Sequence, residues 1–229
     1  MSAEQKTILV IGANGALGKE VSKLLLEHGF AVIGTARSNE SAATLPAGLK
    51  QALLLDLEDQ TSIDTLTNYL NNSSDSLDGI VNASGRVGFG PVTETPAEDA
   101  RRLMQINHLG PAAVISALLP KLAASTNEPF VAAITGVVAE KVFPGMSAYV
   151  ASKTAHSTWL KAFGMEARRA KVRVLDSRPG HTETGLATRP LFGSAPAFPT
   201  GMTAEFVASK IVEGILNGAT ELPSEAFSS

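Results

Sequence analysis

Short apolar runs alternate with longer amphipathic segments along most of the chain. Six runs of four or five largely apolar residues lie at 7–11, 31–35, 51–55, 79–82, 130–134 and 172–175. Near-continuous apolarity is typical of parallel strands covered on both faces, whereas a strand with one wet face alternates. The pattern therefore predicts six buried strands in a parallel sheet.

Segments with helical spacing of apolar residues separate these strands. The expected helices lie at 16–28, 61–71, 95–109, 111–122, 148–170 and 203–217. Thr61 and Asp64 are placed as a capping pair, and Gly110–Pro111 predicts a kink between two of the helices. Strands alternating with helices predict right-handed βαβ units. We expect an α/β fold with a doubly wound parallel sheet, as one domain over residues 1–229.

One region breaks this rhythm. Residues 178–201 contain four prolines and four glycines and no periodic pattern. Loops this long in compact domains are usually functional. We expect a substrate loop at about 181–203, with Leu191, Phe192 and Phe198 as apolar contacts.

Composition excludes several classes of protein. The chain of 229 residues has 19 basic and 22 acidic residues, for a net charge of −3, and no cysteine. The balance gives no basic patch for nucleic acid, and the lack of cysteine excludes disulfides and thiolate chemistry. With no long apolar run, we expect a cytoplasmic protein without a membrane partner.

The four histidines are scattered. His28, His108, His156 and His181 show no metal-ligand spacing, so no metal site is expected. His28 is interpreted as a helix-end residue, His156 as a residue on a helix surface and His108 as a packing residue. His181 is a candidate for substrate contact.

A glycine turn follows the first strand. Gly12, Gly15 and Gly18 lie where the chain enters the first helix, and a turn that passes close to a pyrophosphate cannot carry side chains. Arg37 ends the second strand, where a carboxylate would accept hydrogen bonds from a ribose and repel a 2′-phosphate. Arg37 therefore favours NADP(H) over NAD(H); the alternative is a solvated surface arginine.

Tyr149 and Lys153 are four residues apart on an expected helix and share one face. A free tyrosine has a pKa of about 10, and a nearby cation favours the phenolate. A lowered pKa would let Tyr149 act as general acid or base on a carbonyl or alcohol. The alternative is an ordinary half-buried tyrosine beside a solvated lysine.

Together these segments resemble the short-chain dehydrogenase/reductase family, whose fold is of the Rossmann type. The resemblance runs from Thr7 to about Gly218 and keeps the family's order of motifs. The further motifs are Asp56 after the third strand, Asn82-Ala83-Ser84-Gly85 after the fourth, Ile106-Asn107-His108 on a helix, and Pro179-Gly180 with Thr184.

The resemblance implies roles for individual residues. At the adenosine end, Gly12, Asn14, Leu17 and Gly18 would line the phosphate turn, Arg37 would hold the 2′-phosphate, and Asp56 and Leu57 would border the adenine. Asn82, Ala83 and Ser84 would pass under the ribose, and Pro179, Gly180, Thr182 and Thr184 would lie at the nicotinamide. Lys153 would bind the nicotinamide ribose and lower the pKa of Tyr149, and Asn107 would hold a water in a proton relay to Lys153. It also implies a homodimer or homotetramer.

Two positions depart from the family pattern. The usual spacing would place glycine at 16, where this chain has Ala16 after Gly15. The family usually has a serine thirteen residues before the tyrosine to bind the substrate carbonyl, and here that position is Gly136. Thr135 is expected to point to the opposite face of its strand. Ser147 and His181 are the two candidates to replace the serine.

Two functions follow. The first is an NADP(H)-dependent oxidoreductase that interconverts a small apolar carbonyl compound and its alcohol, with Tyr149 as acid/base beside Asn107 and Lys153. The second, suggested by Gly136, is a catalytically weak NADP(H)-binding sensor or scaffold. The glycine spacing alone also suggests a sugar-nucleotide epimerase or dehydratase, but the chain is short for the separate substrate domain of such enzymes.

Overall fold

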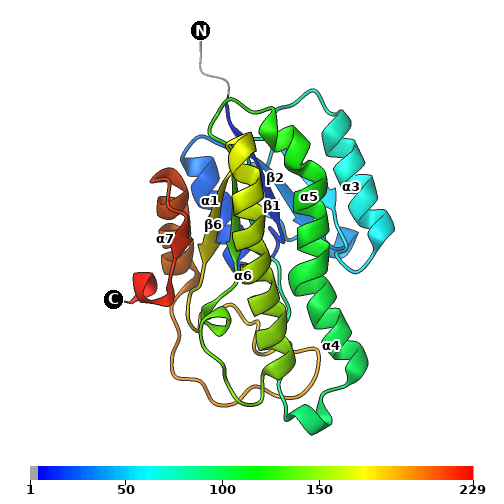
Figure 1. Cartoon of the computed structure of the whole chain (residues 1–229), viewed down its shortest axis with the longest axis vertical. Helices are drawn as coiled ribbons and strands as arrows, with labels where there is room; N and C mark the ends of the chain where they lie inside the picture. The colour runs from blue at the N-terminus through cyan, green and yellow to red at the C-terminus, as the bar shows by residue number, and fades with distance from the viewer. Residues whose placement is uncertain (1–4, 229) are drawn as a thin grey trace.

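A computed structural model describes residues 5–228 and shows one seven-stranded parallel sheet in the order β3-β2-β1-β4-β5-β6-β7 (Figure 1). The strands are β1 Thr7–Ile11, β2 Ala31–Ala36, β3 Gln51–Leu54, β4 Gly79–Asn82, β5 Phe130–Ile134, β6 Arg173–Ser177 and β7 Glu221–Leu222. The expected doubly wound α/β fold is confirmed.

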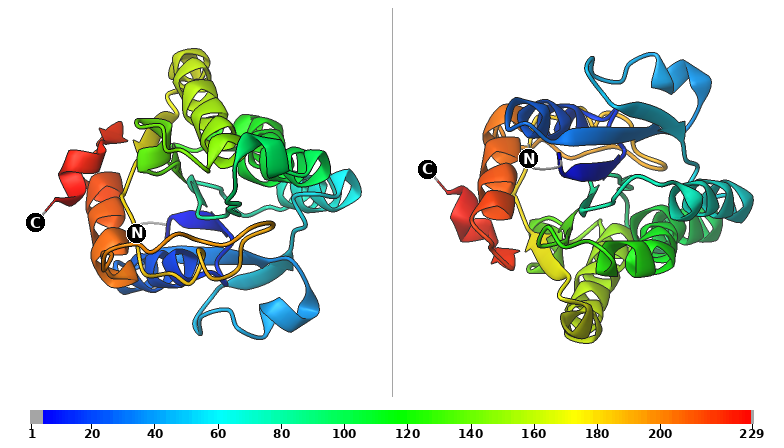
Figure 2. Two further views of the ribbon diagram at one scale, coloured as in Figure 1. Left: turned by 90° about the horizontal axis from the view of Figure 1, so that it is seen from below. Right: turned by 90° about the horizontal axis from the view of Figure 1, so that it is seen from above.

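Helices cover both faces of the sheet (Figure 2). Helices α1 Ala16–Glu27 and α7 Ala204–Leu216 pack together on one face. The other face carries α3 Gln60–Asn72, α4 Ala97–Met104, α5 Gly110–Ala123 and α6 Ser147–Ala167. The short α2, Asn39–Ala42, follows β2. No helix within residues 5–228 has the length and apolarity that crossing a bilayer requires.

Alternate residues of the central strands pack into two separate cores. On β1, Leu9 and Ile11 face α3, α5 and α6, whereas Ile8 and Val10 face α1 and α7, and all four side chains are buried. This two-sided burial explains why the strands read as continuous apolar runs. The edge strand β3 is the exception, because its Leu54 is largely exposed.

The strand order reverses between β1 and β4. The chain runs from β1 outward to β2 and β3, and then returns to the other side of β1 to form β4. At such a point the loops after the two neighbouring strands turn to opposite faces and leave a crevice at the carboxyl ends. The fold therefore places any ligand site beside the loops that follow β1 and β4.

Several expected boundaries were wrong. Strand β6 continues through Asp176 and Ser177, which are both buried. The Asp176 carboxylate is compensated there by hydrogen bonds from the Thr135 and Ser157 hydroxyls. The cap of α3 is Asp59, whose Oδ1 accepts from the Thr61 N–H at 2.9 Å, instead of the expected Thr61–Asp64 pair. The short elements α2 and β7 carry too little periodicity to be predicted.

The expected kink between α4 and α5 is a wide helical turn at Gln105–Leu109. Pro111 has no N–H to donate back along the helix, which favours a wider hydrogen-bond spacing before it. A Cβ on Gly110 would lie 2.6 Å from the carbonyl oxygen of Leu57, so only glycine permits this approach. Such turns are frequent at functional sites, and this one carries Asn107.

Candidate active site

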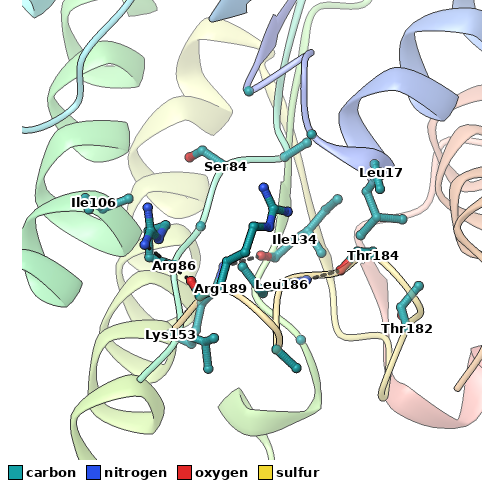
Figure 3. A pocket seen from close by; sticks show the side chains of 18 of the residues that line it. Leu17, Ser84, Arg86, Ile106, Ile134, Lys153, Thr182, Thr184, Leu186 and Arg189 are labelled. Carbon is teal, nitrogen blue, oxygen red and sulfur yellow. Dashed lines mark hydrogen bonds between the residues drawn. The ribbon is translucent and has the colours of Figure 1, made fainter. Parts of the chain in front are cut away.

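A cavity of about 740 Å³ lies at the carboxyl ends of β1 to β6 and is shown in Figure 3. Most of the predicted site residues line it: Gly12, Asn14, Leu17, Arg37, Asp56, Leu57, Ala83, Ser84, Tyr149, Lys153, Pro179, Gly180, Thr182 and Thr184. Gly18, Asn82 and Asn107 are buried and do not line it.

The glycine turn is packed too closely for side chains. A Cβ on Gly18 would overlap the carbonyl oxygen of Gly12, and a Cβ on Gly12 would lie 3.1 Å from the Cα of Ser84. In the described chain, α1 has no side-chain cap and no acidic residue in its first turn. Its first N–H groups are therefore suited to an anion, so the turn fits a dinucleotide phosphate.

The departure at Ala16 leaves this geometry intact. Gly15 is the residue that precedes α1, with φ −74° and ψ 163°, a conformation open to most residues. Ala16 is the first helical residue and lines the cavity. The close approach depends on Gly12 and Gly18, and both are present.

The second and third strands supply the far end of the cavity. Arg37 follows β2 and is exposed on the cavity wall beside Ser41. Asp56 follows β3, and its Oδ1 accepts a 2.9 Å hydrogen bond from the Glu58 N–H. A guanidinium at this end of the cavity can pair with a phosphate group.

Tyr149 and Lys153 lie on α6 and line the same cavity wall. The Lys153 side chain is only 5% exposed, and its Nζ donates to the Ile134 carbonyl oxygen at 2.8 Å. A Cβ on Gly85 would lie 3.2 Å from Nζ and 3.4 Å from the Oδ1 of Asn107. The loop after β4 therefore passes directly over the lysine.

The titration of these two groups differs from the expectation. Burial raises the pKa of Tyr149 to about 12, where the sequence suggested that Lys153 would lower it. Burial lowers the pKa of Lys153 to about 8, although the negative charge of Asp176 partly opposes this. Desolvation is the largest cause of both shifts. At neutral pH, Tyr149 is a neutral phenol, the form that donates a proton.

Asn107 fixes the loop after β4. Its Oδ1 accepts from the Arg86 N–H at 2.8 Å, and its Nδ2 donates to the Arg86 carbonyl oxygen and to the Ser152 Oγ, each at 2.9 Å. Ser152 in turn donates to the Tyr149 carbonyl oxygen at 2.8 Å. Asn107 therefore connects the backbones of Arg86 and Tyr149, on two walls of the cavity.

Asn82 supports the same loop from below. Its Oδ1 accepts from the Ser84 Oγ at 2.6 Å, and its amide nitrogen lies 3.3 Å from Nε2 of His156. His156 is completely buried, so its interpretation as a helix-surface residue was wrong. It faces the sheet and stacks on Trp159 with 5.6 Å between ring centroids, and burial lowers its pKa to about 3.

Gly136 stands where the family usually has serine, and its backbone excludes one. Its φ of 81° and ψ of 164° lie in a region that only glycine populates readily. Thr135 points away as expected, because its Oγ1 donates to Asp176 at 2.5 Å. Of the two candidate substitutes, His181 lines the cavity and stacks on Phe198, whereas Ser147 is exposed and is not among the wall residues.

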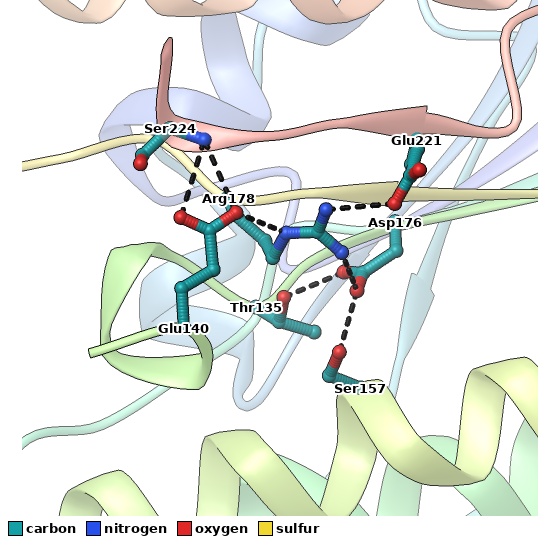
Figure 4. A network of polar contacts seen from close by, with 7 residues as sticks. All are labelled: Thr135, Glu140, Ser157, Asp176, Arg178, Glu221 and Ser224. Carbon is teal, nitrogen blue, oxygen red and sulfur yellow. Dashed lines mark hydrogen bonds and ion pairs between the residues drawn. The ribbon is translucent and has the colours of Figure 1, made fainter. Parts of the chain in front are cut away.

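A buried ion-pair network underlies this part of the site (Figure 4). Arg178 pairs with Asp176 at 3.1 Å, with Glu140 at 2.5 Å and with Glu221 at 2.8 Å. Asp176 also accepts from Ser157 on α6 at 2.6 Å. The network joins β6, β7 and α6, and it places a carboxylate near Lys153.

The 181–203 loop borders the cavity and contacts the loop after β4. The backbones pair where Leu191 N donates to the Val87 carbonyl oxygen at 2.8 Å and Phe89 N donates to that of Phe192 at 3.1 Å. Phe198 lines the cavity, whereas Leu191 packs against the core, and Phe192 packs against Gly88.

Two cavity residues, Arg86 and Arg189, were not predicted. Arg86 directly follows the Asn82–Gly85 motif, and Arg189 lies in the loop that the proline and glycine content identified. A basic residue beside a cofactor-binding motif or within a binding loop was the sequence signal that could have identified them as site residues. Among residues 5–228, no group of three acidic or histidine side chains is arranged to hold a metal ion.

A family model described as short chain dehydrogenase matches residues 6–190. The dehydrogenase/reductase SDR family member 7B of Xenopus tropicalis is 23% identical, over 96% of this chain and 77% of its own. A fatty acyl-CoA reductase of Acinetobacter baylyi is 26% identical, over 95% of this chain and 76% of its own.

Solved structures agree with the fold. A short-chain dehydrogenase from Streptomyces avermitilis superposes with a TM-score of 0.83 at 25% identity, over 96% of this chain and 88% of that one. One from Burkholderia cenocepacia in complex with NADP gives 0.83 at 21% identity, over 98% and 90%. One from Sphingobium yanoikuyae in complex with NADPH gives 0.85 at 20% identity, over 95% and 87%.

Proposed function

Because this chain belongs to the short-chain dehydrogenase family, a family of oxidoreductases, we propose that it is an NADP(H)-dependent reductase of small apolar carbonyl compounds. The observation that carries the proposal is the meeting of Tyr149 and Lys153 with the glycine turn on one cavity. The residues of the cavity wall fit a dinucleotide, with free helical N–H groups at one end and a buried ammonium at the other.

The chain's own groups would manage the proton. A bound nicotinamide supplies the hydride, and the protein supplies position and field. Tyr149, a neutral phenol whose pKa burial raises to about 12, donates its hydroxyl proton to the carbonyl oxygen. The Lys153 ammonium, fixed on Ile134, favours the phenolate that remains. Asn107 holds the loop over Lys153, where a relay water would return the proton.

The preference for NADP(H) rests on Arg37. Arg37 lies on the cavity wall after β2. No residue among 5–228 forms an ion pair with its guanidinium. A phosphate on the adenosine ribose would supply that partner. Titration of the protein with NADPH and NADH tests this; NADPH should bind more tightly, and Arg37→Gln should remove the difference.

The substrate class follows from the other end of the cavity. Around Tyr149 the wall is apolar and is formed by Phe89, Val138, Phe143, Met146 and Phe198. Such a wall favours apolar ketones or aldehydes over sugars or charged acids. We place the substrate among these side chains, of which Phe198 belongs to the 181–203 loop.

A second function is a nucleotide-binding sensor or scaffold. Gly136 favours it, because the donor that usually binds the substrate carbonyl is absent and its backbone excludes a serine. Losing one such donor can lower the rate by about 10²–10³. His181 is the side chain placed to compensate.

NADPH consumption over a panel of apolar carbonyl compounds separates the two functions. Turnover that His181→Ala weakens would support the reductase, with His181 as the carbonyl donor. Tight NADPH binding without consumption of any carbonyl would instead support the sensor.

A further inference from the structure

Three arginine side chains line the candidate cavity without an ion-pair partner among residues 5–228. They come from three different places: Arg37 follows β2, Arg86 follows β4, and Arg189 belongs to the 181–203 loop. Figure 3 shows the Arg189 side chain pointing into the cavity from this loop. Arg37 is already assigned to the adenosine phosphate, which leaves two guanidinium groups without a role.

The acidic residues on the wall do not neutralise them. Glu58 is paired with Arg102 at 2.8 Å, and Asp56 accepts from the backbone. Burial, together with the positive charges of Arg37, Arg102 and Arg189, lowers the pKa of Arg86. Like charges crowded into one cavity are stabilised when an anion binds among them.

Arg189 lies alongside the glycine turn. Besides the main cavity, it lines an adjoining groove together with residues at the start of α1. That groove is lined by Asn14, Gly15, Ala16 and Lys19, and also by the acidic Glu20, Glu183 and Glu205. Its Nε donates to the Gly185 carbonyl oxygen at 3.0 Å, within its own loop. Arg189 therefore shares this groove with the first residues of α1, whose N–H groups have no side-chain cap.

Arg86 holds this part of the loop. Its Nη2 donates to the Arg189 carbonyl oxygen at 3.3 Å, and its own backbone is fixed by Asn107. Its Nε is buried and has no partner in the described chain. A buried guanidinium N–H without an acceptor is costly.

We propose that Arg189, held in place by Arg86, binds the diphosphate of the cofactor and closes the 181–203 loop over it. The proposal rests on the proposed dinucleotide cofactor, but it concerns the diphosphate, which NADPH and NADH share. Arg37 would distinguish the two cofactors, whereas Arg189 would not. A planar guanidinium binds two phosphate oxygens through two parallel N–H bonds in a fixed geometry, whereas a lysine ammonium acts as a point charge.

The test compares dissociation constants for NADPH and NADH, measured by nucleotide fluorescence, in the wild type and in Arg189→Gln, Arg189→Lys and Arg37→Gln. Arg189 is exposed, so its substitution should not disturb folding. Arg169→Gln is the matched control, because Arg169 is an exposed arginine that does not line the cavity. Arg189→Gln should weaken NADPH and NADH by the same factor, about tenfold or more. Arg189→Lys should recover only part of this loss.

Three results would overturn the proposed contact between Arg189 and the diphosphate. They are unchanged affinity for both nucleotides in Arg189→Gln, a loss of affinity confined to NADPH, and a higher KM for the carbonyl compound with unchanged nucleotide affinity. The first result would show that Arg189 does not contact the nucleotide. The second would show that it contacts the 2′-phosphate, and the third that it contacts the substrate. The proposed reductase fails separately, if the wild type binds both nucleotides but reduces no carbonyl compound.

Discussion

The Nζ of Lys153 donates a 2.8 Å hydrogen bond to the carbonyl oxygen of Ile134, the last residue of β5. This bond fixes a buried ammonium at the carboxyl edge of the sheet, beside the switch in strand order. The fold, rather than the helix alone, therefore sets where the charge beside Tyr149 lies.

The pH dependence of carbonyl reduction should follow the protonation state of the Lys153 side chain. Its pKa is lowered to about 8, so the ammonium is lost as the pH rises through that value. Tyr149 keeps its proton until about pH 12 and sets no limit in this range. We expect kcat/KM for reduction to fall above about pH 8 in a pH–rate profile. A profile that stays flat to pH 10 would contradict the role of Lys153.

Asn107→Ala should destabilise the fold as well as the site. The change leaves the N–H and the carbonyl of Arg86 without their partner, and the Ser152 Oγ loses the donor that it accepts from. At about 1–3 kcal/mol for each orphaned group, partly offset by water, we expect a loss of about 2–4 kcal/mol in the free energy of unfolding. Urea denaturation measures it. Ser152→Ala, which removes only one of these bonds, is the control and should lose less.

Gly136→Ser should not restore a family-like site. The φ of 81° and ψ of 164° at this position cost a side-chain-bearing residue about 1–3 kcal/mol. We expect lower stability without a gain in reductase rate. Gly136→Ala carries the same strain without a hydroxyl, so the two variants should behave alike in thermal unfolding and turnover. A faster Gly136→Ser enzyme would show that the backbone adapts and the missing donor limits the rate.

Acid should destabilise the protein through His156. Burial lowers its folded pKa to about 3, from an unfolded value of 6.5, so between these values only the unfolded chain takes up a proton. The stability contributed by the neutral ring is present above pH 6.5 and is lost as the pH falls toward 3, with a slope approaching about 1.4 kcal/mol per pH unit. Urea unfolding followed by Trp159 fluorescence measures it. His156→Gln should flatten the dependence relative to the wild type, whereas exposed His28→Gln should keep it.

Much of the fold was readable from the sequence, because continuous apolar runs such as 130–134 reflect two-sided burial. The motif residues of the site were readable for a related reason: parallel strands all end at one edge, so residues after successive strands converge. Features set by tertiary packing were not readable. His156 looks like a surface residue on an α-helix of mixed polarity, but tertiary packing buries it, with Asn82, Trp159 and His108 among its neighbours.

The pKa shifts and the backbone conformation of the site could not be predicted from the sequence for the same reason. The spacing of Tyr149 and Lys153 indicates attraction between them, but the pKa of each depends on how deeply the fold buries it. The residues next to Gly136 in the sequence do not indicate its positive φ. Arg189 reaches the glycine turn only because a loop without periodicity folds back across the cavity.

The most direct test of the account is the single-turnover rate of Tyr149→Phe with saturating NADPH and an apolar carbonyl substrate, measured beside the variant's dissociation constant for NADPH. Removing the phenol hydroxyl should lower the rate by about 10²–10⁴-fold, because no other group delivers the proton, and should leave NADPH binding unchanged. A variant that reduces the substrate at the wild-type rate would contradict the assignment of Tyr149.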